Sequence, residues 1–137
     1  MKIGELAKQS GLSTHTLRFY EKSGLLPAST RTDSNYRVYS RGDLDTAVFI
    51  KRARAIGFGL DEVALFLSIR SDLSAHVCAE AKSLADRKIV EVEQKMAELA
   101  QSLGALHKLS TACCGGNASA EYCSIIEALD QPKMRTE

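Results

Sequence analysis

Three of the four cysteines in this chain of 137 residues fall within eleven positions of one another. They are Cys113, Cys114 and Cys123, and they flank the polar, glycine-containing stretch GGNASAEY. Clustered thiolates bind soft or borderline metal ions such as Zn(II), Cd(II), Pb(II) or Hg(II), and they also undergo redox chemistry. The cluster therefore predicts a metal site. The alternative is a thiol redox sensor, in which Cys113 or Cys114 reacts and Cys123 resolves the oxidised form.

The fourth cysteine, Cys78, lies at the start of a segment that predicts one long helix. Residues 79–109 contain no proline, and their apolar residues recur at the a and d positions of a heptad. These positions hold Ala85, Ile89, Val92, Met96, Leu99, Leu103 and Leu106. At about 1.5 Å per residue, roughly thirty helical residues measure about 45 Å, so Cys78 cannot reach the other cysteines within one chain.

The apolar seam of this helix must be buried against another element, and the sequence predicts no second long helix. The same helix from another copy is the expected partner, which predicts a homodimer. If the two helices run antiparallel, Cys78 of one subunit approaches the cysteine loop of the other. Each dimer then holds two equivalent sites that are shared between the subunits.

The N-terminal half predicts a winged helix-turn-helix. The stretches IGELAKQSG and THTLRFYEKSG indicate two short helices joined by a tight GLS turn, with Ser13 or Thr14 as the cap of the second helix and either Tyr20 or Phe19 facing inward. A polar turn at residues 33–35 predicts a hairpin wing, and two further helices follow. In such a motif the second helix enters the major groove of DNA.

The charge distribution favours a polyanionic partner for this half. Residues 1–72 carry 11 Lys and Arg against 8 Asp and Glu, whereas residues 73–137 carry 7 against 9. We predict a mainly α fold with a winged helix-turn-helix DNA-binding domain at 1–72. A dimerisation helix at 73–110 is expected next, followed by a metal-binding loop with a short helix at 111–131 and a tail at 132–137.

Several function classes are disfavoured by composition. No segment approaches the ~18 to 20 consecutive apolar residues of a membrane span, and the first ten residues do not resemble a secretory leader. We therefore expect a cytoplasmic protein with no membrane partner, in which structural disulfides are disfavoured. A hydrolase or thiol enzyme is also disfavoured, because the loop holds only Glu121 as a candidate acid–base group and no cleft-forming domain is left over.

Five stretches together resemble the MerR family of metal-responsive transcriptional regulators, over roughly residues 2–130. They are IGELAKQSGLSTHTLRFYEKSGLL, NYRVYSRGDL, FIKRARAIGFGLDEV, the long helix that opens at Cys78, and ACC…YCSIIEAL. The resemblance implies a dimer on promoter DNA, held by an antiparallel coiled coil. It also implies that metal binding untwists and bends the promoter, so that RNA polymerase can use an over-long spacer.

The resemblance further implies the charge of the ion. Within the family, a cysteine at the start of the dimerisation helix is typical of divalent-ion sensors, whereas sensors of monovalent ions resemble one another in having serine there. Cys78 therefore implies a divalent ion, bound by Cys113, Cys123 and the partner's Cys78. Cys114 is a fourth ligand, a ligand to a second ion, or a bystander.

The paired cysteines followed by YCSI are most similar to the zinc branch, with cadmium and lead sensors close by. The zinc branch has a histidine in the loop, and this loop has none. Zn(II) is the first expectation, while Cd(II), Pb(II) or Hg(II), and the number of ions, stay open. His76 and His107 are expected to be surface or capping residues rather than ligands. The predicted function is activation of a metal efflux or resistance promoter.

The resemblance also implies a set of DNA contacts. It places Thr16, Arg18 and Tyr20 on the second helix near the groove, and Tyr36 and Arg37 on the wing near the DNA backbone. Arg18 is the first choice for a base or groove contact, because only side chains that reach base edges select sequence. For Tyr20 the alternative is packing in the core.

Overall fold

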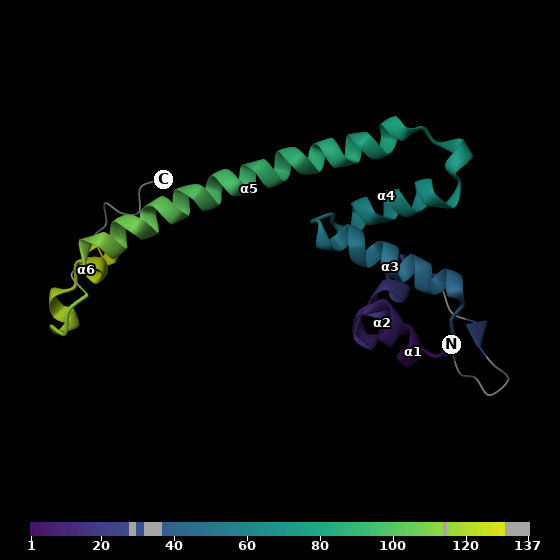
Figure 1. The fold of residues 1–137 in the computed structure, drawn as a ribbon, viewed down its shortest axis with the longest axis horizontal. Helices are drawn as coiled ribbons and strands as arrows, with labels where there is room; N and C mark the ends of the chain where they lie inside the picture. Colours follow the sequence, from purple (N-terminus) through teal and green to yellow (C-terminus); the bar gives the residue numbers. More distant parts are fainter. Residues whose placement is uncertain (28–29, 32–36, 114, 131–137) are drawn as a thin grey trace. The chain divides into compact units, whose positions relative to one another are not determined.

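The structure is a computed structural model that describes residues 1–27, 30–31, 37–113 and 115–130. In this part of the chain, helices dominate and a pair of short strands forms the only sheet (Figure 1). The chain divides into two compact units, Met1–Lys88 and Ile89–Glu137. The predicted mainly α fold is confirmed.

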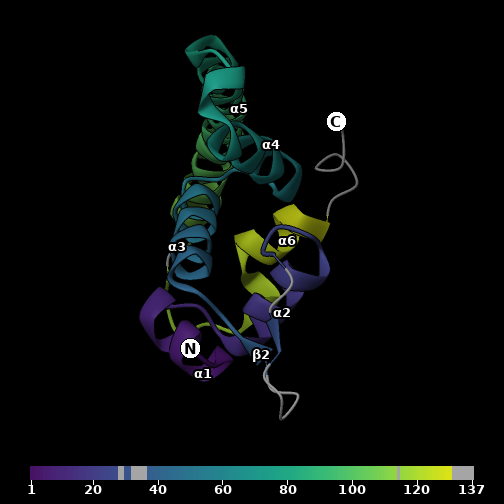
Figure 2. The same cartoon turned by 90° about the vertical axis from the view of Figure 1, so that its right-hand side faces the viewer.

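The first unit opens with the predicted helix-turn-helix, formed by α1 (Ile3–Ser10) and α2 (Thr14–Lys22). Gly11 ends α1 with a φ of 77°, a left-handed conformation in which glycine carries no steric penalty. Ser13 is the predicted cap of α2, and its Oγ accepts a hydrogen bond from the Thr16 N–H at 3.0 Å. Helix α1 packs against both α2 and α3 (Figure 2).

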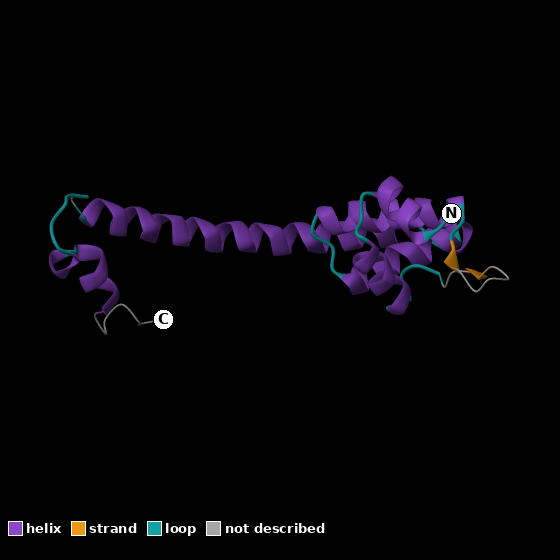
Figure 3. Cartoon of the chain, turned by 90° about the horizontal axis from the view of Figure 1, so that it is seen from below, coloured by secondary structure: helices purple, strands orange, loops and turns teal. Residues whose placement is uncertain are grey.

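The wing is a short antiparallel hairpin. Strand β1 (Thr30–Arg31) pairs with β2 (Arg37–Val38), and both strands are drawn in orange in Figure 3. In this pairing Thr30 lies opposite Val38. The predicted hairpin is therefore confirmed, and its predicted turn at residues 33–35 lies outside the described residues.

The wing leads directly into α3 (Arg41–Ala55) through a capping box. The Ser40 Oγ accepts from the Asp43 N–H at 3.1 Å, and the Ser40 N–H donates to Asp43 Oδ2 at 2.8 Å. This reciprocal pair satisfies two donors at the helix start and fixes the point where the wing ends. Helix α4 (Leu60–Ser71) follows and packs against α3.

The core of this unit settles the choice between the two adjacent aromatic residues of α2. Tyr20 is buried, whereas Phe19 keeps 47% of its surface exposed. The other large side chains of the buried cluster come from α1 to α4, from the loops that follow α2 and α3, and from the residue after β2. They include Leu6, Leu17, Leu26, Tyr39, Ile50, Phe58 and Val63.

A 3-10 turn, η1 (Leu73–Ala75), leads into the long helix α5 (Cys78–Ala112). The first turns of α5 belong to the first unit, because Leu84 is buried and Lys88 Nζ lies 2.9 Å from Glu62 Oε1. The rest of α5 belongs to the second unit, together with the 3-10 turn η2 (Ala120–Tyr122) and α6 (Ser124–Asp130).

The predicted seam of α5 is apolar and, in the single chain, largely exposed. Its exposed large side chains are Ile89, Val92, Met96, Leu99, Leu103 and Leu106. Among the described residues, none of the helices combines the length and apolar character that crossing a membrane requires.

Candidate metal centre and nucleic-acid interface

Two of the predicted metal ligands meet in the second unit. Cys113 directly follows α5 and Cys123 directly precedes α6, and the side chain of Cys113 is close enough to influence the thiol of Cys123. Backbone N–H groups of Ile126 and then Ile125, in the first turn of α6, donate to Cys123 and lower the pKa of its thiol below the ordinary 9.0. The contact with Cys113 lowers this pKa further, whereas burial raises it.

Cys113 is held by the turn that leaves the helix. The Gly115 N–H donates to Cys113 Sγ at 3.4 Å, and Gly115 adopts a φ of 72°, a left-handed conformation that glycine reaches without strain. A backbone donor thus points at the sulfur of Cys113. At Cys123, the N–H groups that lower the pKa favour the thiolate, which is the form that binds metal ions.

The pair supplies part of a ligand set. Soft and borderline ions take three or four ligands, and Cys113 and Cys123 account for two of them. The predicted ligand Cys114 lies outside the described residues. Within the described part of one chain, no three Cys, His, Asp or Glu side chains gather closely enough to hold an ion. His107 lies exposed on a late turn of α5.

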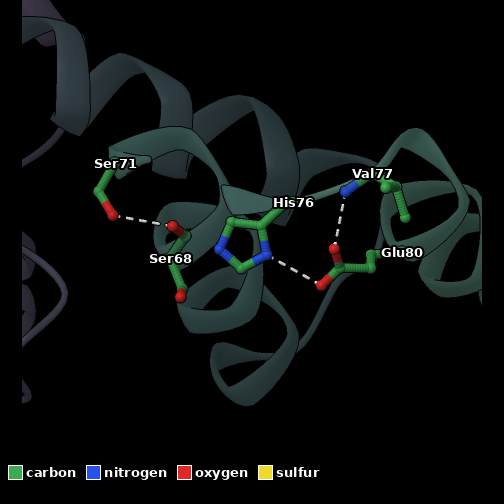
Figure 4. A network of polar contacts seen from close by, with 5 residues as sticks. All are labelled: Ser68, Ser71, His76, Val77 and Glu80. Carbon is green, nitrogen blue, oxygen red and sulfur yellow. Dashed lines mark hydrogen bonds and ion pairs between the residues drawn. The ribbon is translucent and has the colours of Figure 1, made fainter. Parts of the chain in front are cut away.

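The remaining predicted ligand, Cys78, is the first residue of α5 and its thiol is exposed. The start of this helix is fixed by Glu80, whose Oε2 accepts from the Val77 N–H at 2.8 Å while Oε1 lies 2.9 Å from His76 Nδ1 (Figure 4). The His76 contact, followed by that of Val77, lowers the pKa of Glu80. His76 and Val77 therefore precede the helix and are held by Glu80 in its first turn. These contacts fix the backbone just before Cys78, the first residue of α5.

The end of α4 approaches the same region. Ser71 Oγ donates to the Ser68 carbonyl at 2.8 Å and closes the last turn of that helix (Figure 4). The segment between α4 and α5 is therefore bounded by hydrogen-bonded helix ends on both sides.

The predicted DNA contacts on α2 differ in their exposure. Arg18 is exposed, as a side chain that reaches for DNA must be. Thr16 is half-buried, and its Oγ1 accepts from Ser13 Oγ at 2.8 Å, which ties it to the helix cap. Tyr20 lies in the core, the alternative that the sequence left open, whereas the adjacent Phe19 faces outward.

The wing carries a contact that sequence reasoning missed. Arg37 is exposed as predicted, but its Nη1 lies 2.5 Å from Glu21 Oε1, near the end of α2. The Tyr39 hydroxyl also donates to this oxygen, at 3.4 Å. The available signal was Glu21 itself, an acidic residue in the last turn of a helix, where the helix dipole disfavours negative charge. The predicted contact Tyr36 lies outside the described residues.

The chain matches known proteins over most of its length. Residues 2–39 match the family model described as MerR family regulatory protein, and residues 44–109 match the model described as MerR, DNA binding. These two models cover the helix-turn-helix unit and most of α5.

Full-length relatives extend the match to the cysteine loop. The HTH-type transcriptional regulator ZntR of Escherichia coli is 42% identical over 130 residues, which are 95% of this chain and 92% of that protein. The mercuric resistance operon regulatory protein of Serratia marcescens is 36% identical over 135 residues, covering 97% and 92%. The solved structure of the transcription regulator PbrR691 from Ralstonia metallidurans in complex with lead(II) superposes with a TM-score of 0.81, at 36% identity and with 94% and 98% covered.

Proposed function

The chain belongs to the MerR family of transcriptional regulators, in its divalent-metal branch, and on that premise we propose that it activates a metal efflux or resistance promoter when a soft or borderline divalent ion binds. The observation that carries the proposal is the pair Cys113 and Cys123 at the ends of α5 and α6, where a backbone N–H donates to Cys113 Sγ and the pKa of the Cys123 thiol is lowered. Regulation of transcription, and not an enzymatic reaction, is the activity of this family. We also propose that the protein works in the cytoplasm, where promoters are available.

The ligand set is completed by a second subunit in this proposal. Cys78 begins α5 and Cys113 follows its end, and a helix of 35 residues rises about 50 Å. An antiparallel homodimer brings the partner's Cys78 next to the pair Cys113 and Cys123, and three thiolates then face one ion. Three roles stay open for Cys114: a fourth ligand, a ligand to a second ion, or a bystander.

The resulting cross-link couples metal binding to DNA shape. The ion supplies a bond between the loop of one subunit and the helix start of the other. In each subunit the first turns of α5 pack with the DNA-binding unit, through Leu84 and the Lys88–Glu62 ion pair. A bond at Cys78 therefore biases the angle between the two DNA-binding units, and bending a promoter costs only a few kcal/mol. RNA polymerase is the partner that uses the distorted promoter.

The ligand chemistry selects the class of ion. Three thiolates around a divalent ion leave about one net negative charge, which suits Zn(II), Cd(II), Pb(II) and Hg(II). The loop contains no histidine, so the thiolates dominate the set. Zn(II) is the first choice, supported by the similarity to ZntR. The structural relative PbrR691 was solved in complex with lead(II), which supports Pb(II) as an alternative ion.

A complementation experiment tests the shared site. Cys78→Ser removes one ligand from every site, and the double variant Cys113→Ser/Cys123→Ser removes the other two, so neither homodimer binds metal tightly. Co-expressed as a heterodimer, one chain supplies Cys78 and the other an intact loop, which restores one complete site. Metal bound by the purified heterodimer, measured by native mass spectrometry, supports sharing. If the heterodimer binds no more metal than the two variant homodimers, the site is not shared between subunits.

Promoter footprinting tests the switch itself. We expect the centre of the promoter to become hypersensitive to cleavage only when metal is present, while the flanking half-sites stay protected in both states. An identical pattern with and without metal would show that the protein binds DNA but does not distort it in response to the ion.

A thiol redox sensor on the same scaffold is the second candidate, and the contact between Cys113 and Cys123 favours it specifically. A thiolate of lowered pKa beside a second thiol reacts readily with oxidants to form a disulfide. The two functions separate under strictly reducing conditions. A promoter response that a chelator abolishes there indicates metal sensing, whereas a response that appears only with oxidant indicates redox sensing.

A further inference from the structure

Glu21 is placed where its charge does not help its own helix. It lies in the last turn of α2 (Thr14–Lys22), where the carbonyl end of the helix dipole opposes a carboxylate. Its side chain is nevertheless only 10% exposed. A nearly buried carboxylate needs partners, and Arg37 Nη1 at 2.5 Å and the Tyr39 hydroxyl at 3.4 Å are two of them.

Both partners belong to the wing. Arg37 is in strand β2 (Arg37–Val38), and Tyr39 follows it directly with its ring buried in the core. The carboxylate therefore joins the helix that carries Arg18 to the strand that carries Arg37. These two arginines are the exposed cations among the proposed DNA contacts on described residues.

We propose that Glu21 is a positioning residue for DNA binding, which holds the Arg37 guanidinium so that its free N–H groups face a phosphate at a fixed place relative to α2. The inference rests on the proposed function, because it concerns the same DNA-binding surface. A guanidinium carries five N–H donors in a rigid plane, and the Arg37 side chain stays 43% exposed while Nη1 faces Glu21. The remaining edge is thus available to DNA.

Two physical effects of Glu21 on DNA binding have opposite signs. As a negative charge near the DNA-facing surface, it repels phosphate, so its neutralisation strengthens binding on Coulomb grounds. As an ion-pair partner, Glu21 orders the Arg37 side chain in the free protein and so reduces the conformational entropy that is lost when DNA binds. For binding by Arg37, the second effect is the larger.

The salt dependence of binding separates positioning from a general loss of structure. Each phosphate contact contributes about 0.9 to the slope of log affinity against log salt. If Arg37 loses its phosphate in both subunits, the slope falls by about 2 and affinity falls by about tenfold or more. A variant that is only less stable has fewer folded molecules, but the molecules that remain folded bind DNA with the salt slope of wild type.

The experiment compares wild type, Glu21→Gln, Glu21→Asp and Glu5→Gln in promoter binding over a range of salt. Glu5 is an exposed carboxylate of α1, so its variant controls for the loss of one negative charge. Glu21→Asp keeps the charge but shortens the side chain, so the ion pair with Arg37 is lost while the Coulomb term remains. Circular dichroism and thermal unfolding confirm that each variant is folded.

We expect Glu21→Gln and Glu21→Asp both to bind more weakly with a reduced salt slope, and Glu5→Gln to bind like wild type. In an Arg37→Ala background, Glu21→Gln should change the slope no further. Equal or tighter binding by Glu21→Gln, or a wild-type slope in Glu21→Asp, overturns the inference while the proposed function stands. If the wild-type chain itself binds no promoter fragment, the proposed function fails, and the inference fails with it.

Discussion

Truncation of the α5 seam tests the dimer on which the shared metal site depends. Leu99 occupies a d position of the heptad and is 68% exposed in the single chain. Val90 lies one position beyond the seam residue Ile89, off the a and d positions, and is 66% exposed. Leu99→Ala and Val90→Ala therefore remove apolar surface of similar exposure, and only the first lies where a partner helix is expected.

The expected cost follows from the surface that a partner would cover. Full burial of a leucine side chain stabilises by about 1.5 to 3 kcal/mol, and roughly two thirds of Leu99 remains to be buried. Because the change occurs in both subunits, the dimer loses about 2 to 4 kcal/mol. At 1.4 kcal/mol for each factor of ten, the dissociation constant rises roughly 30- to 700-fold. Val90→Ala should change it by less than about threefold.

Sedimentation equilibrium with reductant and a chelator measures this constant without help from the metal. We expect Leu99→Ala to shift toward monomer at concentrations where wild type and Val90→Ala remain dimeric. If Leu99→Ala associates as tightly as wild type, or if Val90→Ala dissociates equally, the seam is not the dimer interface and the argument for the shared site fails.

The other predictions concern the site and the two helix starts. Cys78→Ser should abolish the promoter response to divalent ions while promoter affinity stays within about threefold of wild type, and a variant that still responds would remove Cys78 from the ligand set. Ser13→Ala should lower the free energy of unfolding by about 1 kcal/mol through loss of the α2 cap, seen as a lower urea midpoint, and an unchanged midpoint would contradict the capping role. The hydrogen bond from the Gly59 N–H, and to a smaller extent Lys88, lower the pKa of Glu62 below its ordinary value of 4.5. The stability that these contacts contribute is therefore complete above pH 4.5 and is lost as the pH falls through the lower folded-state pKa. Glu62→Gln should therefore be less stable than wild type at about pH 7, and the difference should shrink as the pH falls through the folded-state value. A difference in stability that stays constant as the pH is lowered into the acid-unfolding range would contradict this linkage.

Local patterns in the sequence account for most of the fold. The GLS turn, the Ser13 cap and the heptad each act over a few residues, so their physical meaning does not depend on distant parts of the chain. The helix-turn-helix, the hairpin and the long helix were predictable for this reason, and each is confirmed by the structure. The cysteine cluster was equally visible, because residue type alone identifies thiol chemistry.

Tertiary packing decided the features that depend on residues far apart in the chain. The sequence allowed either Phe19 or Tyr20 to face the core, and in the folded unit Tyr20 belongs to the buried cluster while Phe19 stays exposed. The ion pair between Glu21 and Arg37 spans sixteen positions and exists only because the wing folds back on α2. Such contacts carry no periodic signal, since they depend on the angle at which two elements meet.

The sequence by itself determined where the thiols lie along the chain and predicted which helix is long enough to carry a dimer seam. It could not determine how the sulfurs of the loop are oriented. Only the tertiary structure brings Cys113 and Cys123 together and places the first turn of α6 against the thiol of Cys123. The physical reason is that ligand identity resides in single residues, whereas ligand geometry depends on how the backbone at the ends of two helices is held.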